Sequence, residues 1–191
     1  MSDSQLWAEL KNGSRQAFRE IYDQNITKLV GYARKFTSET ELIEDTIHDV
    51  FVQIWDRKAT LGPTDSIIKY LCVTLRRELI RRLEKATQTA GFESAENKDI
   101  HFQVSQEDLL IHNENTGLIT EKLHMGFETL SNRQKEAIFL KFYEELSYEE
   151  ICEVMDINYQ SVRNLISKGI MELRKFMVSV AWILALMHCL Q

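Results

Sequence analysis

The stretch that decides the fold is LSNRQKEAIFLKFYEELSYEEICEVMDINYQSVRNLISKGIMELRKF, residues 130–176. Two capping-box pairs within it predict helix starts: Ser131 with Gln134, and Ser147 with Glu150. After a break at residues 156–158, a longer helix is expected over residues 159–177. A short helix, a tight turn and a longer helix are the pattern of a helix-turn-helix, whose second helix enters the DNA major groove.

The longer helix has two chemically distinct faces. One face is apolar and predicts core packing: Val162, Leu165, Ile166, Gly169, Leu173 and Phe176. The opposite face carries side-chain types that contact base edges and phosphates: Gln160, Asn164, Ser167 and Met171, flanked by Arg163, Lys168 and Arg174. Taken alone, such a face also fits a solvated packing helix, so the rest of the chain must decide between the two interpretations.

The composition predicts an all-α protein, because one proline and seven glycines leave few breaks among 191 residues. We expect two helical domains, at residues 1–85 and 121–177. A flexible acidic linker that runs into the next helix is expected over residues 86–120, and an apolar tail over residues 178–191. The linker carries one basic residue against six acidic ones. The net charge of −6 argues against indiscriminate coating of nucleic acid.

Several function classes are disfavoured by the residues present. The three cysteines are isolated, without a CxxC pair or a nearby histidine at ligand spacing, so neither a disulfide framework nor a zinc site is expected. The five histidines are scattered, and no nucleophile–base spacing or phosphate-binding loop occurs. The first thirteen residues include charged side chains and no apolar run, unlike a signal peptide. We therefore expect a cytoplasmic protein that is not an enzyme and needs no cofactor or metal.

A helix expected over residues 40–57 presents carboxylates opposite its apolar stripe. The residues on that face are Asp45, Asp49, Val52 and Asp56, with His48 and Gln53 at its edges. Metal binding or acid–base chemistry fits poorly, because a single convex helix brings no second set of ligands to the carboxylates. A protein-docking surface is favoured, and a merely solvated face is the alternative.

The next helix, expected from Asp65 or Ser66 to about Lys85, is basic. Its core stripe is Ile68, Leu71, Leu75, Leu79 and Leu83. A second stripe is polar and basic with an embedded aromatic ring: Lys69, Tyr70, Thr74, Arg76, Arg77, Arg81 and Arg82. Basic groups hold phosphates and an aromatic ring stacks on unpaired bases, so this stripe favours nucleic-acid binding. A solvated basic helix is again the alternative.

An acidic helix, a basic helix and a helix-turn-helix, in this order, resemble the extracytoplasmic-function (ECF) sigma factors. These are specificity subunits of bacterial RNA polymerase within the sigma-70 family. Three segments carry the resemblance: EDTIHDVFVQIW at 44–55, Tyr70-Leu71 through Arg76-Arg77, and the helix-turn-helix. It covers residues 18–85 and 129–175, about three-fifths of the chain. Each motif is weak alone, and the combination is specific.

The resemblance implies partners and surfaces. It implies binding to core RNA polymerase and promoter DNA, and it makes an anti-sigma factor a candidate partner, because inhibitory partners are common in the family. The polymerase contacts implied are the clamp of the largest subunit, which falls on Asp45, Asp49, Val52 and Gln53, and the flap.

The resemblance also implies two DNA contacts. It assigns contact with the minus-ten element, and its opening, to Tyr70, Arg77 and Arg81, with residues 58–64 receiving an unpaired base. It assigns reading of the minus-thirty-five element to Gln160, Ser161, Arg163, Asn164 and Lys168. Three further DNA-facing residues follow from the helix faces alone: Lys69, Ser167 and Arg174.

The chain departs from the family pattern at four positions. Asp156 stands where the family usually has Gly in the turn, and Asp adopts a left-handed conformation less readily. Tyr70 replaces a common Trp and Arg77 a common Asn, so the surface is a firmer prediction than either residue. His48 stands where Gln or Glu is usual, which we expect to weaken polymerase binding.

Two other function classes remain open. A free-standing transcriptional regulator that binds an operator explains the helix-turn-helix, but it leaves the acidic and basic helices without a role. A helical adaptor or inhibitor requires the basic faces to be incidental. A pull-down of core polymerase by the isolated protein discriminates between these classes and a sigma factor.

The end of the chain, residues 176–190, is apolar apart from Ser179 and His188. At 15 residues it is shorter than the roughly 17–25 needed to span a bilayer, and it lacks the basic face of an interfacial helix. Three fates remain: packing on the N-terminal domain, burial in a partner or dimer, and peripheral membrane contact. We expect packing within the protein or against a partner. Packing on the N-terminal domain would hold both DNA faces closed until polymerase opens them.

Overall fold

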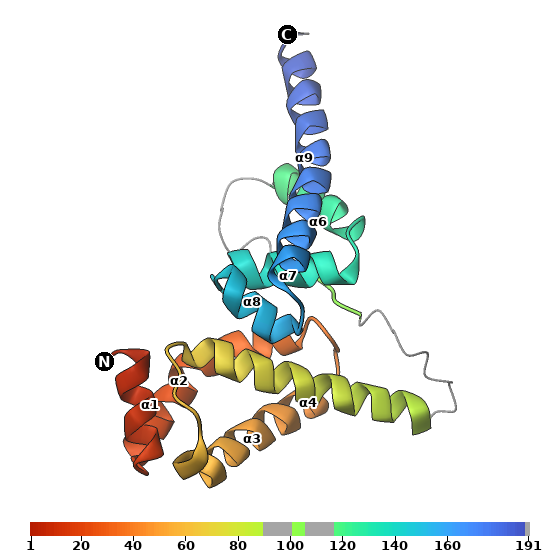
Figure 1. Ribbon diagram of the computed structural model, residues 1–191. Coiled ribbons are helices and arrows are strands. Elements are labelled where there is room, and N and C mark those ends of the chain that lie inside the picture. Colours follow the sequence, from red (N-terminus) through yellow and green to blue (C-terminus); the bar gives the residue numbers. More distant parts are fainter. Residues whose placement is uncertain (90–100, 106–116, 190–191) are drawn as a thin grey trace. The chain divides into compact units, whose positions relative to one another are not determined.

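The computed structural model describes residues 1–89, 101–105 and 117–189 (Figure 1). Side chains are described up to Ala86 and up to Lys175 in the outer two segments, apart from residues 117–120 and 122. The described residues form helices, turns and loops without a strand, which confirms the all-α class. The chain divides into two compact units, the first built from α1 to α4 and grouped with Glu153–Asp156 at the end of α8, and the second from α6, α7, α9 and the rest of α8.

The first unit contains four α-helices and one short 3₁₀ helix. They are α1 (Asp3–Lys11), α2 (Arg15–Ala33), α3 (Thr40–Arg57), η1 (Lys58–Thr60) and α4 (Ile67–Thr89). Serine side chains begin the first two helices. Ser2 forms a capping box with Gln5, and Ser14 Oγ accepts a hydrogen bond from the Ala17 N–H at 3.2 Å.

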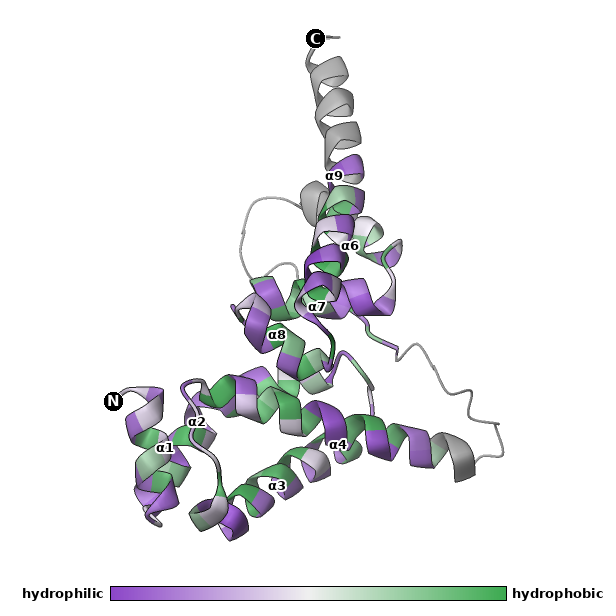
Figure 2. Cartoon of the chain, viewed as in Figure 1, coloured by the Kyte–Doolittle hydropathy of each residue, from purple (hydrophilic) through white to green (hydrophobic). Residues whose placement is uncertain are grey.

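The core of the first unit lies where α4 packs against α2 and α3. Leu71, Leu75 and Leu79 of α4 are fully buried there. The apolar stripe expected on α3 is buried as well: Ile43, Ile47, Val50, Phe51 and Ile54. Each fully buried aliphatic side chain stabilises the fold by about 1.5–3 kcal/mol relative to an exposed one. Figure 2 shows hydrophobic and hydrophilic residues alternating along both helices, as expected for helices buried on one side.

Both ends of α4 differ from the expectation. Ile67 is the fully buried residue at its start, whereas Ile68, expected in the core stripe, is only half-buried. The helix also continues beyond Lys85 to Thr89, because no glycine or proline occurs before Gly91 to end it. The linker expected from residue 86 therefore begins with four helical residues, and residues 90–100 lie outside the described part.

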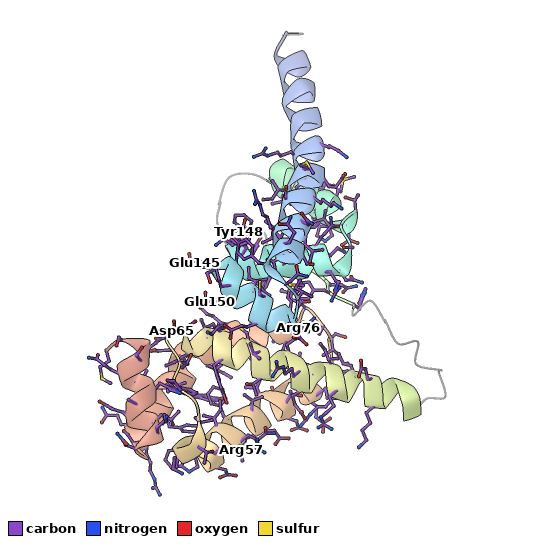
Figure 3. All side chains as sticks on the ribbon, in the orientation of Figure 1. Arg57, Asp65, Arg76, Glu145, Tyr148 and Glu150 are labelled. Atoms are coloured by element: carbon purple, nitrogen blue, oxygen red, sulfur yellow. The ribbon has the colours of Figure 1, made fainter. Side chains whose placement is uncertain are left out.

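The second unit contains α6 (Gly117–Glu128), α7 (Asn132–Phe142), α8 (Tyr148–Met155) and α9 (Tyr159–Cys189). Both predicted capping boxes are confirmed. The Gln134 N–H donates to Ser131 Oγ at 3.3 Å and the Ser131 N–H donates to Gln134 Oε1 at 2.9 Å. Ser147 and Glu150 form the same reciprocal pair at 3.1 and 2.7 Å, and Glu150 is labelled at α8 in Figure 3. The caps explain why α7 and α8 begin where the sequence predicted.

The long helix α9 packs on α6 and α7. Val162, Ile166 and Gly169 of its apolar face are buried, while Leu165 and Leu173 are partly exposed. A Cβ atom at Gly169 would lie 2.6 Å from Ile138 Cδ1 of α7, closer than carbon atoms can approach. Glycine at this position therefore lets the two helices pack closely.

Residues 101–105 are anchored on the second unit, although they lie inside the linker expected over residues 86–120. Phe102 and Val104 are buried, at 1% and 2% exposure. The Phe102 ring lies 5.8 Å from the Phe139 ring, and its N–H donates to Asn132 Oδ1 at 3.2 Å. A search for helical periodicity missed this anchor, because two apolar residues in an irregular segment leave no such signal.

The turn between α8 and α9 has the left-handed residue that the sequence comparison suggested. Asp156 has φ 54°, a conformation that glycine adopts without steric cost. Asn158 then caps α9, since its Oδ1 accepts a hydrogen bond from the Ser161 N–H at 2.9 Å. This cap follows a recognisable sequence signal, because Asn is among the preferred residues at a helix start.

Helix α9 continues beyond the expected end at Met177 as far as Cys189. The side chains of the apolar tail lie outside the described residues, so its packing stays a prediction. Within the described part of the chain, no helix is long and apolar enough to cross a bilayer.

We predict that Asp156→Gly stabilises the second unit by about 0.5–1 kcal/mol, because glycine removes the Cβ strain at positive φ. The greater freedom of glycine in the unfolded chain offsets part of this gain. Chemical denaturation of both proteins measures the difference. Glu149→Gly, at an exposed position in the first turn of α8, is the matched control and should lose about 0.5–1 kcal/mol. Equal losses in the two variants would contradict the strain at Asp156.

Candidate functional site

The exposed face of α3 combines a carboxylate with an apolar side chain. Asp45 and Gln53 are exposed, and Val52 retains 41% of its surface. Asp45 forms no ion pair or hydrogen bond through its side chain within the described part of the chain. An unpaired carboxylate next to an exposed aliphatic group suits contact with a partner that offers a cation beside an apolar side chain.

Asp49, expected on the same face, is already engaged. Its Oδ2 accepts a hydrogen bond from Arg82 Nη2 of α4, and its Oδ1 lies 3.7 Å from His48 Nδ1. Arg82 Nε also donates to Glu78 Oε1 at 2.7 Å, so one guanidinium joins carboxylates on two helices. Asp49 therefore links the acidic face of α3 to the basic helix, a role that the sequence did not indicate.

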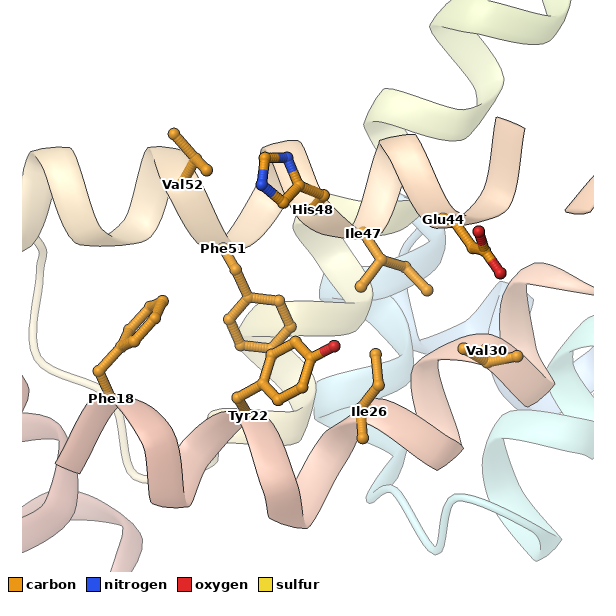
Figure 4. Close-up of a pocket in the computed structure, with 9 residues that line it drawn as sticks. All are labelled: Phe18, Tyr22, Ile26, Val30, Glu44, Ile47, His48, Phe51 and Val52. Carbon is orange, nitrogen blue, oxygen red and sulfur yellow. The ribbon is translucent and has the colours of Figure 1, made fainter. Parts of the chain in front are cut away.

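An apolar groove lies next to this face, between α2 and α3 (Figure 4). Its volume is about 250 Å³. Tyr22 on α2 and Val52 on α3 border it and stay exposed, and the Tyr22 ring lies 4.9 Å from the Phe51 ring. Glu44 and His48 are the polar residues at its rim. The docking face thus continues into a concave surface that can accept an apolar side chain of a partner.

The basic stripe on α4 is only partly available. Arg77 is exposed, and its guanidinium has no partner among the residues that the structure describes. Arg81 is exposed too, but it is held by Glu78, with Nη2–Oε1 at 2.6 Å and Nε–Oε2 at 2.9 Å. Arg77 is therefore the cation that can bind a phosphate without first breaking an ion pair.

Two other residues expected on this stripe have neighbours within the first unit. The Tyr70 ring lies 4.9 Å from the Trp7 ring of α1, tilted by 56°, and Tyr70 is half-buried. Lys69 Nζ lies 3.6 Å from Asp65 Oδ1. Removing the Tyr70 ring would therefore disturb the packing of α1 as well as any contact with a base.

Glu78 is an unusually acidic carboxyl. The hydrogen bond from Arg81, reinforced by Arg82, lowers the pKa of Glu78 from its ordinary 4.5 to about 2, although partial burial acts in the opposite direction. Glu78 thus stays ionised far into the acid range. It holds Arg81 and Arg82 in place on α4.

The outer face of α9 is polar, basic and accessible. Six of the seven residues predicted to contact DNA there are exposed, and Ser161 is half-buried: Gln160, Ser161, Arg163, Asn164, Ser167, Lys168 and Arg174. Gln160 Nε2 donates to Asn164 Oδ1 at 3.0 Å, so the two amides are aligned along the helix. Arg163, Lys168 and Arg174 form no ion pair with any described residue. The face therefore offers aligned amides between free cations.

The structure groups the predicted residues by unit. Asp45, Asp49, Val52 and Gln53 lie together on α3, and Lys69, Tyr70, Arg77 and Arg81 lie on α4 of the same unit. Sequence reasoning missed Arg82 as a bridge and Trp7 as a neighbour of Tyr70. Neither contact has a sequence signal, because each joins side chains on separate helices.

These features define a class of protein: a two-unit helical DNA-binding protein with a helix-turn-helix in the second unit and a separate docking face in the first. Two family models match the chain, Sigma-70 region 2 over residues 21–89 and Sigma-70, region 4 over residues 120–173. Together they cover more than half of it. The chain belongs to the sigma-70 family of RNA polymerase sigma factors, in the ECF group.

Curated relatives carry the same group name. The chain is 24% identical over 174 residues to the ECF RNA polymerase sigma factor SigK of Mycolicibacterium vanbaalenii, covering 89% of this chain and 86% of that protein. It is 22% identical over 163 residues to the RNA polymerase sigma factor YlaC of Bacillus subtilis, covering 85% and 93%. The resemblance inferred from the residues is thus confirmed for the family, and the roles of single residues stay predictions.

Solved structures support the fold. CnrH in complex with the cytosolic domain of CnrY has a TM-score of 0.61 at 16% identity, over 93% of this chain and 97% of that one. The sigma factor RpoE in complex with the anti-sigma factor NepR from Bartonella quintana has a TM-score of 0.59 at 20% identity, over 84% and 96%. At these identities the likeness concerns the fold.

We predict that Glu78→Gln lowers the free energy of unfolding by about 1–3 kcal/mol at pH 7, because the charged hydrogen bonds to both arginines are weakened. The folded pKa lies below the unfolded one, so wild type has this advantage above about pH 4.5 and loses it as the pH falls towards 2. Denaturation of both proteins between pH 2 and 7 measures how the difference in their free energies of unfolding depends on pH.

The matched control for Glu78 is Glu84→Gln, which removes an exposed carboxylate of α4 that has no described partner. This variant should have nearly the same free energy of unfolding as wild type, and the difference between them should not change as the pH falls. If the stability difference between wild type and Glu78→Gln stayed constant down to pH 2, the Glu78 carboxyl would not be held in its charged form.

Proposed function

We propose that this chain binds core RNA polymerase through the exposed face of α3 and directs it to promoter DNA through α4 and α9. The observation that carries the proposal is the pairing of opposite surfaces on one chain. The carboxylate of Asp45 on α3 has no described partner, and neither does Arg77 on α4. On α9, Arg163, Lys168 and Arg174 form no ion pair with any described residue. A protein that only bound an operator would need no such acidic face.

The docking surface consists of Asp45, Val52 and Gln53, with Asp49 at its edge. Its expected partner is the clamp of the largest polymerase subunit, and the groove beside Val52 extends it with an apolar recess. Asp45 contributes more to the charge of this surface than Asp49, because Arg82 already neutralises Asp49. The flap of the polymerase is the expected partner of the second unit.

The promoter contacts are divided between the two units. On α4, Arg77 holds a phosphate of the minus-ten element, assisted by Lys69, Tyr70 and Arg81, while the loop before α4 receives an unpaired base. On α9, the amides of Gln160 and Asn164 read base edges of the minus-thirty-five element. Phosphates there are held by the neighbouring cations and hydroxyl groups: Ser161, Arg163, Ser167, Lys168 and Arg174.

The proposed role also sets the remaining expectations. The chain acts as an initiation factor and leaves the chemistry of RNA synthesis to polymerase, so it is not itself an enzyme. Polymerase and promoters meet in the cytoplasm, where the protein is expected to work. An anti-sigma factor that covers the docking face would keep the protein inactive. Among structurally similar proteins, RpoE is solved with the anti-sigma factor NepR and CnrH with the cytosolic domain of CnrY.

Run-off transcription tests the function directly. Purified full-length protein and core polymerase should yield transcripts from selected members of a random promoter library, and core polymerase alone should not. Failure to bind core polymerase would favour the free-standing regulator.

We predict that Asp45→Arg weakens core binding tenfold or more, because like charges facing each other at an interface cost several kcal/mol. Its melting temperature should stay near that of wild type, since Asp45 has no described partner. Fluorescence anisotropy with labelled protein and core polymerase measures the affinity. Asp49→Arg is a poorer test, because it also breaks the contact with Arg82.

The matched control for Asp45 is Glu9→Arg, which makes the same charge change at an exposed position of α1 in the same unit. It should bind core polymerase as wild type does. Equal affinities for wild type and Asp45→Arg would remove the docking role from this face.

We predict that Asn164→Ala and Lys168→Ala affect DNA binding differently. Loss of Asn164 should cost about 1–3 kcal/mol on the preferred promoter only, because an amide discriminates between bases. Loss of Lys168 should weaken binding to all sequences and reduce the salt dependence by about one phosphate contact. Holoenzyme titrations on specific and scrambled DNA at several salt concentrations measure both effects.

Glu172→Gln is the control for these α9 variants, because its carboxylate pairs with Lys175 and lies outside the predicted reading set. Equal losses on specific and scrambled DNA for Asn164→Ala would mean that α9 does not face the bases as proposed.

A further inference from the structure

The connection between α3 and α4 is fastened to the first helix of the chain. Trp7 of α1 is buried, at 1% exposure, and its indole N–H donates to the Gly62 carbonyl oxygen at 2.9 Å. Asp3, at the start of α1, accepts a hydrogen bond through Oδ2 from the Ile67 N–H at 2.8 Å. One hydrogen bond thus joins α1 to the loop of residues 61–66, and a second joins α1 to the first residue of α4, directly after the loop.

The loop has few other fixed points. Thr64 and Ser66 bond to each other, with Thr64 Oγ1 donating to the Ser66 carbonyl at 2.9 Å and the Ser66 N–H donating to Thr64 Oγ1 at 3.2 Å. Pro63 has no N–H to contribute. Among the described residues, the hydrogen bond that joins this loop to an element other than its flanking helices comes from Trp7 of α1, and Asp3 fixes the first residue of α4 beside it. Its conformation therefore depends on α1.

The same tryptophan also supports α4. One side of the Trp7 ring packs on Tyr70 at a centroid distance of 4.9 Å, one turn into α4. Leu6 and Leu10 anchor α1 itself, since both are buried in the first unit. In Figure 1 the loop passes beside α1 on its way to α4, and Figure 3 labels Arg57, at the end of α3, and Asp65, within the loop. A single buried ring thus positions both the loop and the basic stripe.

The loop and α1 border a common cleft of about 480 Å³. Its walls mix apolar and polar side chains, with Ser4, Trp7, Ala8 and Lys11 from α1 and with Pro63, Thr64 and Asp65 from the loop. The backbone of the loop is therefore held by the Trp7 hydrogen bond from α1, while Thr64 and Asp65 line the cleft. A fixed backbone binds an unpaired nucleotide more tightly and more selectively than a mobile one, because less ordering entropy is lost on binding.

We propose that α1 is a brace that holds the loop of residues 61–66 in its base-binding conformation, with Trp7 and Asp3 as the positioning residues. The proposal rests on the proposed function, in which residues 58–64, which include residues 61–64 of this loop, receive an unpaired base of the minus-ten element. It adds a part of the chain outside the matched family region, because the Sigma-70 region 2 match begins at residue 21. The brace acts through the loop, so neither residue has to touch DNA.

The test compares Asp3→Ala with Asp3→Asn in the full-length protein. Asparagine keeps an oxygen that can accept the Ile67 hydrogen bond, whereas alanine removes the acceptor. Amide hydrogen exchange of residues 62–67 in the free protein should be about fivefold faster in Asp3→Ala, as expected for the loss of one hydrogen bond, and near wild type in Asp3→Asn. Trp7→Phe, which removes the indole N–H and keeps a ring against Tyr70, should also accelerate exchange.

The functional readout is base selectivity by holoenzyme. Run-off transcription is measured on promoters that differ at a single minus-ten base. The ratio between the best and the substituted promoter should fall about two- to fivefold in Asp3→Ala and Trp7→Phe, and Asp3→Asn should restore it. A purely structural defect would lower transcription from both promoters equally and leave the ratio unchanged. Glu9→Gln, at an exposed position of α1, should match wild type in both measurements.

Two outcomes would overturn the brace. Unchanged exchange at residues 62–67 in Asp3→Ala and Trp7→Phe would mean that α1 does not fix the loop. Faster exchange with an unchanged selectivity ratio would mean that the fixed loop does not select the base. A wild-type holoenzyme that gives no transcript would instead overturn the proposed function and the selectivity role with it, while the exchange measurement would still report whether α1 holds the loop.

Discussion

Burial of the leucine stripe of α4 is the constraint on which the first unit depends. Leu71, Leu75 and Leu79 recur every four residues and are fully buried, so one side of α4 is committed to α2 and α3. The opposite side then has to face solvent, which places Arg77 and Arg81 at the surface. The same packing brings Arg82 to Asp49 of α3. One apolar stripe therefore determines where the basic and acidic faces lie.

The ion pairs set how much of each charged face is free to act. Glu78 and Asp49 engage Arg81 and Arg82, whereas Arg77 and Asp45 have no described partners. With a net charge of −6, the chain has no general attraction for nucleic acid, so its DNA contacts are confined to small local surfaces. At physiological salt such surfaces act within about 8 Å. This arrangement favours binding at defined positions over non-specific coating.

The second unit depends on backbone geometry more than on charge. Paired caps begin α7 and α8, a left-handed residue at Asp156 turns the chain, and Gly169 allows α9 to approach α7. Each device acts over a few residues, yet together they fix which side of α9 is buried. The polar face that remains carries aligned amides between unpaired cations. In the first unit, hydrogen bonds from Trp7 and Asp3 of α1 similarly fix the backbone that leads into α4.

The sequence by itself determined most of each helix, most of the exposed faces and the family, whereas Arg76, expected on the basic stripe of α4, is buried. Capping boxes, a period of 3.6 and the motif order are local signals, and α3 begins and ends at the residues expected for it. Only the tertiary structure decided that Asp49 is engaged by Arg82, that Tyr70 packs on Trp7 and that Phe102 anchors the end of the linker. These contacts join residues far apart in the chain, and periodicity within one segment carries no information about its neighbour. Which exposed residue is free to bind is therefore a property of packing.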